Sequence, residues 1–165
     1  MESSCTRRSN TMRRITALLI ILVAFPALSS PAFQTVESSQ EAKPKQYAYV
    51  VNGKTITVDF QVFLEGSETK VTKDVFHGYQ LYNSYCFRCH GTDATESSLA
   101  PDLRRFTAEL PRNAFVTVAI AGREDKGMPS WAGFLSQEEI LQIYQYVKGR
   151  SLELRPGGRP PSEYD

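Results

Sequence analysis

Two cysteines three positions apart, with a histidine directly after the second, constrain this chain more than any other feature of its sequence. Cys86, Cys89 and His90 lie in the stretch YCFRCHGT. A C-x-x-C pair is compatible with half of a zinc site, a redox-active dithiol or, when histidine follows, the attachment point of a haem. The rest of the sequence has to distinguish these chemistries, because each makes different demands on the surrounding fold.

The first 32 residues have the order of a secretory signal peptide. Four arginines precede an apolar run from Ile15 to Phe25, and small residues and prolines follow it. The run is shorter than the roughly 18 to 20 residues that a spanning helix needs, so an uncleaved membrane anchor is the less favoured alternative. Small residues at Ser30 and Ala32 predict cleavage near Ala32. We therefore expect a periplasmic protein whose mature chain has no stable membrane insertion.

Cleavage there would simplify the set of reactive side chains. Cys5 would be lost, and the mature chain would keep two cysteines, two histidines (His77 and His90) and one methionine, Met128. Four arginines and one glutamate would go with the signal, so the formal net charge would change from +1 to −2. Neither net charge indicates a nucleic-acid partner, and the sequence has no basic cluster interleaved with aromatic residues.

An extension of residues 33–71 precedes the motif, and we expect it to contain a flexible leader and a β-hairpin. Residues 33–45 are polar and have no apolar period. In QYAYVVNGKTITVDF, Asn52 and Gly53 separate two β-rich runs and favour a two-residue type I′ turn. The resulting register pairs Tyr49 with Ile56.

The rest of the chain predicts an all-α core. Thr72 is the expected N-cap of a first helix that ends at Cys86. Ser136 and Glu139 form a capping box at the start of the last helix, which should end at Gly149. The predicted helices span residues 72–86, 111–121 and 136–149, with loops at 91–107 and 123–135 and a Pro/Gly-rich tail without regular structure at 150–165.

Zinc and dithiol chemistry both fit this sequence poorly. A structural zinc ion needs four ligands, and the mature chain could add only His77 and His90 to the two cysteines. A reactive dithiol is favoured at a helix N-terminus, whereas the predicted helix here precedes Cys86. Attachment of haem c uses all five positions of C-x-x-C-H. Cys86 and Cys89 would then form the two thioethers, and His90 would bind the iron.

Met128 is the expected second axial ligand. Ligands suited to electron transfer are methionine and histidine, and His77 lies on the helix that already leads into the motif. Met128 lies in KGMPSW, 38 residues after His90, in a loop long enough to cross to the other haem face. Trp131 in the same loop is a candidate donor to a haem propionate, with simple packing of the loop as an equal alternative.

These residues resemble the class I monohaem cytochromes c over about residues 72–149. GYQLYNSYC has Gly78 eight residues before the first haem cysteine, where the family uses glycine so that the first and last helices cross closely. Tyr146 matches the aromatic residue on the last helix, and GMPSW matches the axial methionine loop. The resemblance implies a small fold of helices packed around one covalently bound haem. It also assigns to Pro101 the carbonyl that accepts the proximal imidazole N–H, although Ala100 replaces the usual preceding glycine.

The extension and the ending YVKGRSLELRPGG are similar to those of small periplasmic cytochromes that accept electrons from quinoprotein (PQQ-dependent) alcohol dehydrogenases. This resemblance implies a one-electron carrier and not an enzyme. A quinoprotein dehydrogenase would reduce it, and a terminal oxidase or another cytochrome would oxidise it. Two alternatives are a haem-based enzyme or gas-binding protein with an open sixth site, and a cytochrome subunit of a larger redox complex.

Overall fold

The computed structural model describes residues 44–95 and 97–165, which belong to one compact unit of the chain. The predicted signal peptide, its cleavage near Ala32 and nearly all of the leader therefore lie outside the described residues. Within the described ranges, no helix is long and apolar enough to cross a membrane.

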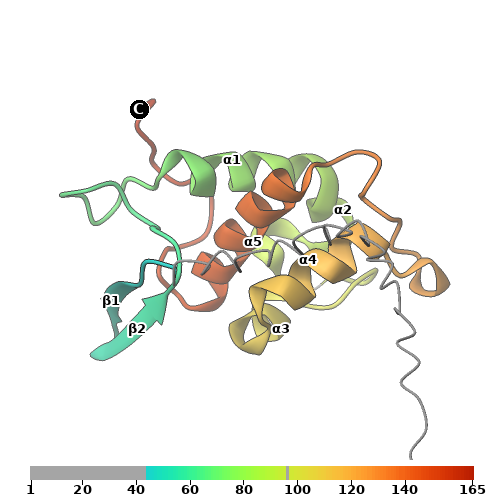
Figure 1. Cartoon of the computed structure of the whole chain (residues 1–165), viewed down its shortest axis with the longest axis horizontal. Coiled ribbons are helices and arrows are strands. Elements are labelled where there is room, and N and C mark those ends of the chain that lie inside the picture. The colour runs from blue at the N-terminus through green and yellow to red at the C-terminus, as the bar shows by residue number, and fades with distance from the viewer. Residues whose placement is uncertain (1–43, 96) are drawn as a thin grey trace, which may run out of the picture. The chain divides into compact units, whose positions relative to one another are not determined.

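The predicted hairpin is confirmed in position and register. Strands β1 (Tyr47–Val51) and β2 (Lys54–Val58) are antiparallel and pair Tyr49 with Ile56 (Figure 1). The two turn residues have positive φ, 51° at Asn52 and 76° at Gly53, as a type I′ turn requires. One face of the hairpin packs against the core, because alternate side chains of β1 are half-buried.

Helices are the main regular structure in the rest of the described chain. They are α1 (Lys73–Leu81), α2 (Phe87–His90), α3 (Leu103–Glu109), α4 (Arg112–Ala121) and α5 (Gln137–Ser151), with a π-helical turn at Tyr82–Cys86. The Thr72 cap and the capping box of Ser136 and Glu139 are both confirmed. Helix α3 lies where the sequence predicts loop, and α5 continues two residues past Gly149.

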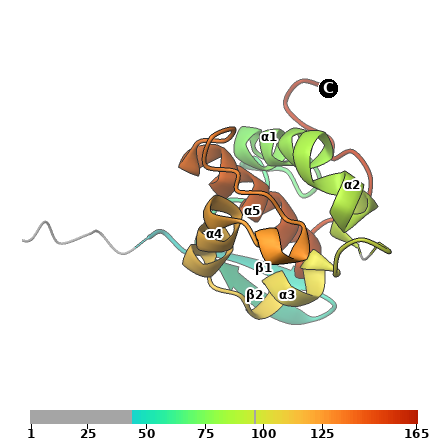
Figure 2. The same cartoon turned by 90° about the vertical axis from the view of Figure 1, so that its right-hand side faces the viewer.

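Helix α5 is the central element, since it contacts α1, α3 and α4 (Figure 2). Its crossing with α1 is close at Gly78, where an added Cβ atom would lie 1.9 Å from the carbonyl oxygen of Gln142. Beside this crossing, the Tyr146 ring centroid lies 5.3 Å from that of Tyr82. The crossing therefore uses the glycine and the aromatic residue that the sequence assigned to it.

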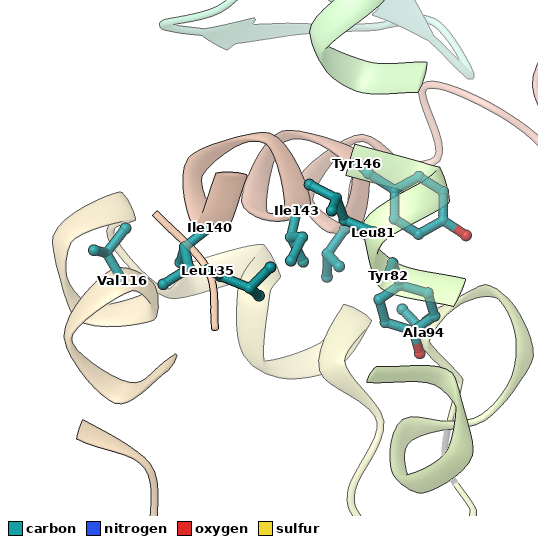
Figure 3. Packing of buried hydrophobic residues seen from close by; sticks show 9 residues of the cluster. Leu81, Tyr82, Ala94, Val116, Leu135, Ile140, Ile143 and Tyr146 are labelled. Carbon is teal, nitrogen blue, oxygen red and sulfur yellow. The ribbon is translucent and has the colours of Figure 1, made fainter. Parts of the chain in front are cut away.

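Helix α5 contributes side chains to two hydrophobic clusters. The first fills the space between α1, α4 and α5, and Figure 3 shows its members: Leu81, Tyr82, Ala94, Val116, Leu135, Ile140, Ile143, Tyr146 and Val147. The second joins the extension to α1 and α5 through Val62, Val71, Val75 and Tyr144. The hairpin side of the molecule and the helices are thus parts of one packed structure.

The tail after α5 has no helix or strand in the described residues, as predicted. It is nevertheless packed against the rest of the protein. Leu154, Arg155 and Ser162 are buried. The backbone N–H of Val71 donates to the carbonyl of Pro161 at 2.9 Å, so the tail also contacts the segment that leads into α1.

Candidate haem site

The C-x-x-C-H motif begins in a π-helical turn and ends in the short helix α2. The sequence predicts one continuous helix over residues 72–86, but α1 ends at Leu81 and the wider π turn follows. A π turn inserts an extra residue into the helical register and is frequent at functional sites. Gly91, with φ 74°, ends α2 immediately after His90.

The two thiols of the motif differ in exposure. Cys86 is half-buried against the first cluster, Cys89 is exposed, and neither is in a disulfide. Burial, with a smaller contribution from Cys89, raises the pKa of the Cys86 thiol to about 12. A reactive dithiol requires a lowered pKa, so the dithiol alternative gains no support. The zinc alternative gains none either, since the described part of the chain has no group of three or more His, Cys, Asp or Glu placed to hold a metal ion.

His90 is oriented by a backbone carbonyl. Its Nδ1 lies 3.1 Å from the oxygen of Pro101. Because a carbonyl oxygen can only accept, Nδ1 carries the proton in this hydrogen bond and the lone pair of Nε2 is left to bind a metal. Burial lowers the pKa of His90 against the opposing effect of the Pro101 hydrogen bond, which favours the neutral, ligating ring.

The segment with Met128 is fixed to the end of α4. The N–H of Arg123 donates to the carbonyl of Met128 at 2.8 Å, and the reverse bond is 3.0 Å. The Ser130 hydroxyl donates to the carbonyl of Ile120 at 2.6 Å. Met128 itself is half-buried. These contacts hold the predicted methionine ligand in a short, defined loop.

An aromatic contact brings this loop to the cysteine motif. The Trp131 ring centroid lies 5.6 Å from that of Tyr85 in an edge-to-face arrangement. Trp131 is three residues after Met128, and Tyr85 is the residue before Cys86. Tyr85 was not among the predicted site residues, and its position beside Cys86 is the one signal for it in the sequence. The packing role of Trp131 is therefore visible, and its hydrogen bond to a propionate stays a prediction.

His77, the other histidine, is engaged elsewhere. It lies on α1, and its Nδ1 is 2.7 Å from the side-chain oxygen of Gln142 on α5. This contact ties the ring to the helix crossing at Gly78.

The side chains around the motif suit haem c. Two thiols one turn apart, an imidazole with a free Nε2 and a thioether on an anchored loop supply the donors that covalent haem needs. Half-buried hydrophobic residues that could line an apolar pocket pack on the same cluster: Leu103, Phe115, Ala119, Ile120 and Trp131.

Known proteins resemble this chain over the same segment. Residues 74–147 match the family model of the cbb3-type cytochrome c oxidase, subunit III. The chain is 37% identical over 87 residues to the quinohemoprotein alcohol dehydrogenase ADH-IIG of Pseudomonas putida, covering 53% of this chain and 12% of that one. It is 37% identical over 75 residues to cytochrome c550 of Pseudomonas aeruginosa, covering 43% and 52%.

A solved structure of a c-type cytochrome also resembles this chain. The c-type cytochrome XoxG from Methylobacterium extorquens AM1 superimposes with a TM-score of 0.53 at 25% identity, covering 57% of this chain and 60% of that one. The chain spans about half the length of cytochrome c550 and a much smaller part of the dehydrogenase.

Fold, motif and relatives together define the class: the chain has a cytochrome c fold and resembles the class I cytochromes c, including those linked to quinoprotein alcohol dehydrogenases. The predicted cofactor, covalently bound haem c, is confirmed by the same relatives. Cytochrome c550 and XoxG are themselves cytochromes c, in agreement with the expected electron-transfer role.

Proposed function

We propose that this protein is a periplasmic one-electron carrier in which His90 and Met128 bind the iron of one haem attached to Cys86 and Cys89. The observation that carries this proposal is the hydrogen bond between His90 Nδ1 and the Pro101 carbonyl, which leaves Nε2 as a metal donor. When bound, the haem supplies one-electron chemistry as its iron alternates between the ferrous and ferric states.

The chain's own contribution is to keep both ligands in place through that cycle. Pro101 fixes the His90 ring, and the paired backbones of Arg123 and Met128 fix the methionine. Ligands that stay bound in both states require little rearrangement, which suits rapid transfer. Methionine ligation favours a relatively high reduction potential.

The alternative of an open sixth site lacks a supporting observation. An enzyme or gas-binding protein would need a distal acid–base group, and His77 is the other histidine. Its contact with Gln142 at the helix crossing holds it away from such a role.

The predicted organisation remains part of the proposal: a signal peptide at 1–32, an extension at 33–71, a cytochrome c domain at 72–149 and a tail at 150–165. Export to the periplasm agrees with the apolar run and the arginines at the N-terminus. The N-terminal mass of the protein purified from the periplasm tests this, with a start near Phe33 as the expected result.

The proposed donor is a quinoprotein alcohol dehydrogenase, and the proposed acceptor is a terminal oxidase or another cytochrome. Similarity to the ADH-IIG sequence supports the donor. Tyr85 precedes Cys86, and Phe87 lies between the two cysteines. Their side chains are 40% and 41% exposed, respectively. They give the motif an apolar rim suited to a small, transient interface.

Rapid mixing of a reduced quinoprotein alcohol dehydrogenase with the ferric cytochrome tests the pathway. We expect the haem to be reduced, and Phe87→Ser to slow the bimolecular step by about tenfold. Val50→Ser on the hairpin, where Val50 is 75% exposed, is the matched control and should leave the rate unchanged. Absence of reduction by the dehydrogenase would remove it as the donor.

A further inference from the structure

The turn that follows His90 includes one residue, Ala94, in a backbone conformation that its residue type does not favour. Residues 91–94 include three positive φ angles, 74° at Gly91, 59° at Asp93 and 64° at Ala94. Aspartate tolerates this region, but alanine adopts it at a cost. Such a conformation persists where neighbouring groups hold it, so the contacts of this turn identify what fixes it.

On its inner side the turn is held by two tyrosines. The Tyr82 hydroxyl donates to the carbonyl of Gly91 at 2.7 Å, and the Tyr146 hydroxyl lies 3.3 Å from Oδ1 of Asp93. Ala94 is fully buried, and Figure 3 shows it beside Tyr82 at one end of the first cluster.

On its outer side the turn is held by the C-terminal tail. The backbone N–H of Gly158 donates to Oδ1 of Asp93 at 2.8 Å. The tail backbone approaches the same carboxylate so closely that a Cβ atom on Gly157 would lie 2.7 Å from its Oδ2. Arg150 on α5 places its Nε 4.0 Å from Oδ1, which supplies a positive charge for the half-buried carboxylate.

Two arginines hold the tail in this position. Arg155 is 4% exposed, its Nη2 donates to the Gly158 carbonyl at 2.7 Å, and its guanidinium carbon lies 5.1 Å from the Tyr146 ring centroid. Arg150 Nη1 donates to the Arg155 carbonyl at 2.7 Å. These two hydrogen bonds and the contact with the Tyr146 ring hold residues 155–158 against α5.

We propose that residues 155–158 clamp the turn at 91–94 through Asp93, and that this clamp holds the backbone from which the His90 ring reaches the Pro101 carbonyl, so that the clamp and Pro101 together set the orientation of the ring. Asp93 is therefore a positioning residue for the proximal ligand, acting through Gly91 and Thr92, the two residues that lie between it and His90. The inference rests on the proposed function, in that His90 must bind the haem iron. A tail that only covered the core would not need a carboxylate at 93 to accept the hydrogen bond of the Gly158 backbone N–H.

The test uses the haem-loaded ferric protein. Proton NMR shifts of the haem methyl groups depend on the orientation of the axial histidine plane. We expect Asp93→Ala to change the pattern of these shifts and to raise amide exchange in residues 91–95 by about tenfold. Asp93→Asn keeps an oxygen acceptor for the Gly158 N–H, so it should largely restore the wild-type pattern.

Arg159→Ala is the matched control. It removes a tail ion pair with Asp165 (2.7 Å) without touching the turn, so the methyl shifts should not change. If Asp93→Ala does not fold, Gly157→Ala tests the same contact, because the added Cβ displaces the carboxylate. The clamp would be overturned if Asp93→Ala, or Gly157→Ala where Asp93→Ala does not fold, bound haem and showed the methyl shifts and amide exchange of the wild type. A wild-type protein without covalent haem would instead overturn the proposed function, so the two failures are distinguishable.

Discussion

Gly78 on α1 lies so close to Gln142 on α5 that a Cβ atom at position 78 would be 1.9 Å from the Gln142 carbonyl oxygen. The atom in the way belongs to the backbone of a buried helix, so it cannot move aside as a flexible side chain would. The same crossing carries His77 and supports the tyrosines next to the haem motif. The fold of the domain depends on this contact.

Gly78→Ala should therefore destabilise the protein. Alanine is favoured over glycine in a helix by about 1 kcal/mol, but overpacking against backbone should outweigh that and leave a net loss of about 3 kcal/mol. Urea unfolding measures the difference. Gly133→Ala is the control, because nothing lies within 4 Å of its Cβ. It should change stability by less than about 0.5 kcal/mol, and a wild-type midpoint for Gly78→Ala would contradict the close crossing.

Gly122 should control the methionine loop. Its φ is 71°, and an added Cβ would lie 2.5 Å from the backbone nitrogen of Ser130. Gly122→Ala should displace the loop and convert part of the ferric haem to a high-spin form, seen in the optical spectrum at neutral pH. Gly127 has a similar φ of 80° but open space around it. Gly127→Ala should cost about 1 kcal/mol of stability and keep the low-spin spectrum. Equal spectra for the two variants would rule out a specific role for the contact at Ser130.

Asp102 links the Pro101 segment to α3. Its Oδ1 accepts from the backbone N–H of Arg104 at 2.8 Å, as an N-cap does. Burial raises the pKa of this carboxyl, but hydrogen bonds from the Arg104 side chain and backbone outweigh it, and the pKa lies below its usual value. The stabilisation is thus complete above the unfolded pKa of about 3.9 and is lost as the pH falls through the lower folded pKa.

Asp102→Ala should accordingly lower the free energy of unfolding at pH 7 by about 1 kcal/mol, and the difference from wild type should shrink below about pH 4. Asp102→Asn retains an oxygen acceptor for the cap but not the charge, so its stability at pH 7 should lie between those of Asp102→Ala and the wild type, without the acid-dependent part. Urea unfolding at both pH values measures this. A difference between Asp102→Ala and wild type that persisted at low pH would mean that the carboxylate charge is not involved.

Local patterns predicted much of this fold. Asn52-Gly53 gave the hairpin turn and its register, and Thr72 and Ser136 marked two helix starts. Helix α3 was missed because its seven residues offer less than two full apolar repeats, although Asp102 is a good N-cap. Gly149 did not end α5, since a buried glycine beside the Arg155 side chain can continue a helix.

The candidate site was predictable only where the motif itself carries the chemistry. Cys86, Cys89 and His90 follow from their spacing, and the family pattern placed Pro101 beside His90. The π turn at Tyr82–Cys86 changes the helical register without a distinct residue pattern. The burial of Arg155 depends on Tyr146 and Gly158, which only the folded tail brings together. Contacts of this kind come from tertiary structure and leave no local signal.

Met128→Ala tests the central claim, ligation of the iron by His90 and Met128, most directly. The optical spectrum of the ferric protein at neutral pH should be low-spin in the wild type and high-spin in this variant, whose ferrous form should also bind carbon monoxide. His77→Ala, which removes the other ligand considered, should keep the wild-type spectrum. A Met128→Ala spectrum identical to that of the wild type would show that Met128 is not the sixth ligand.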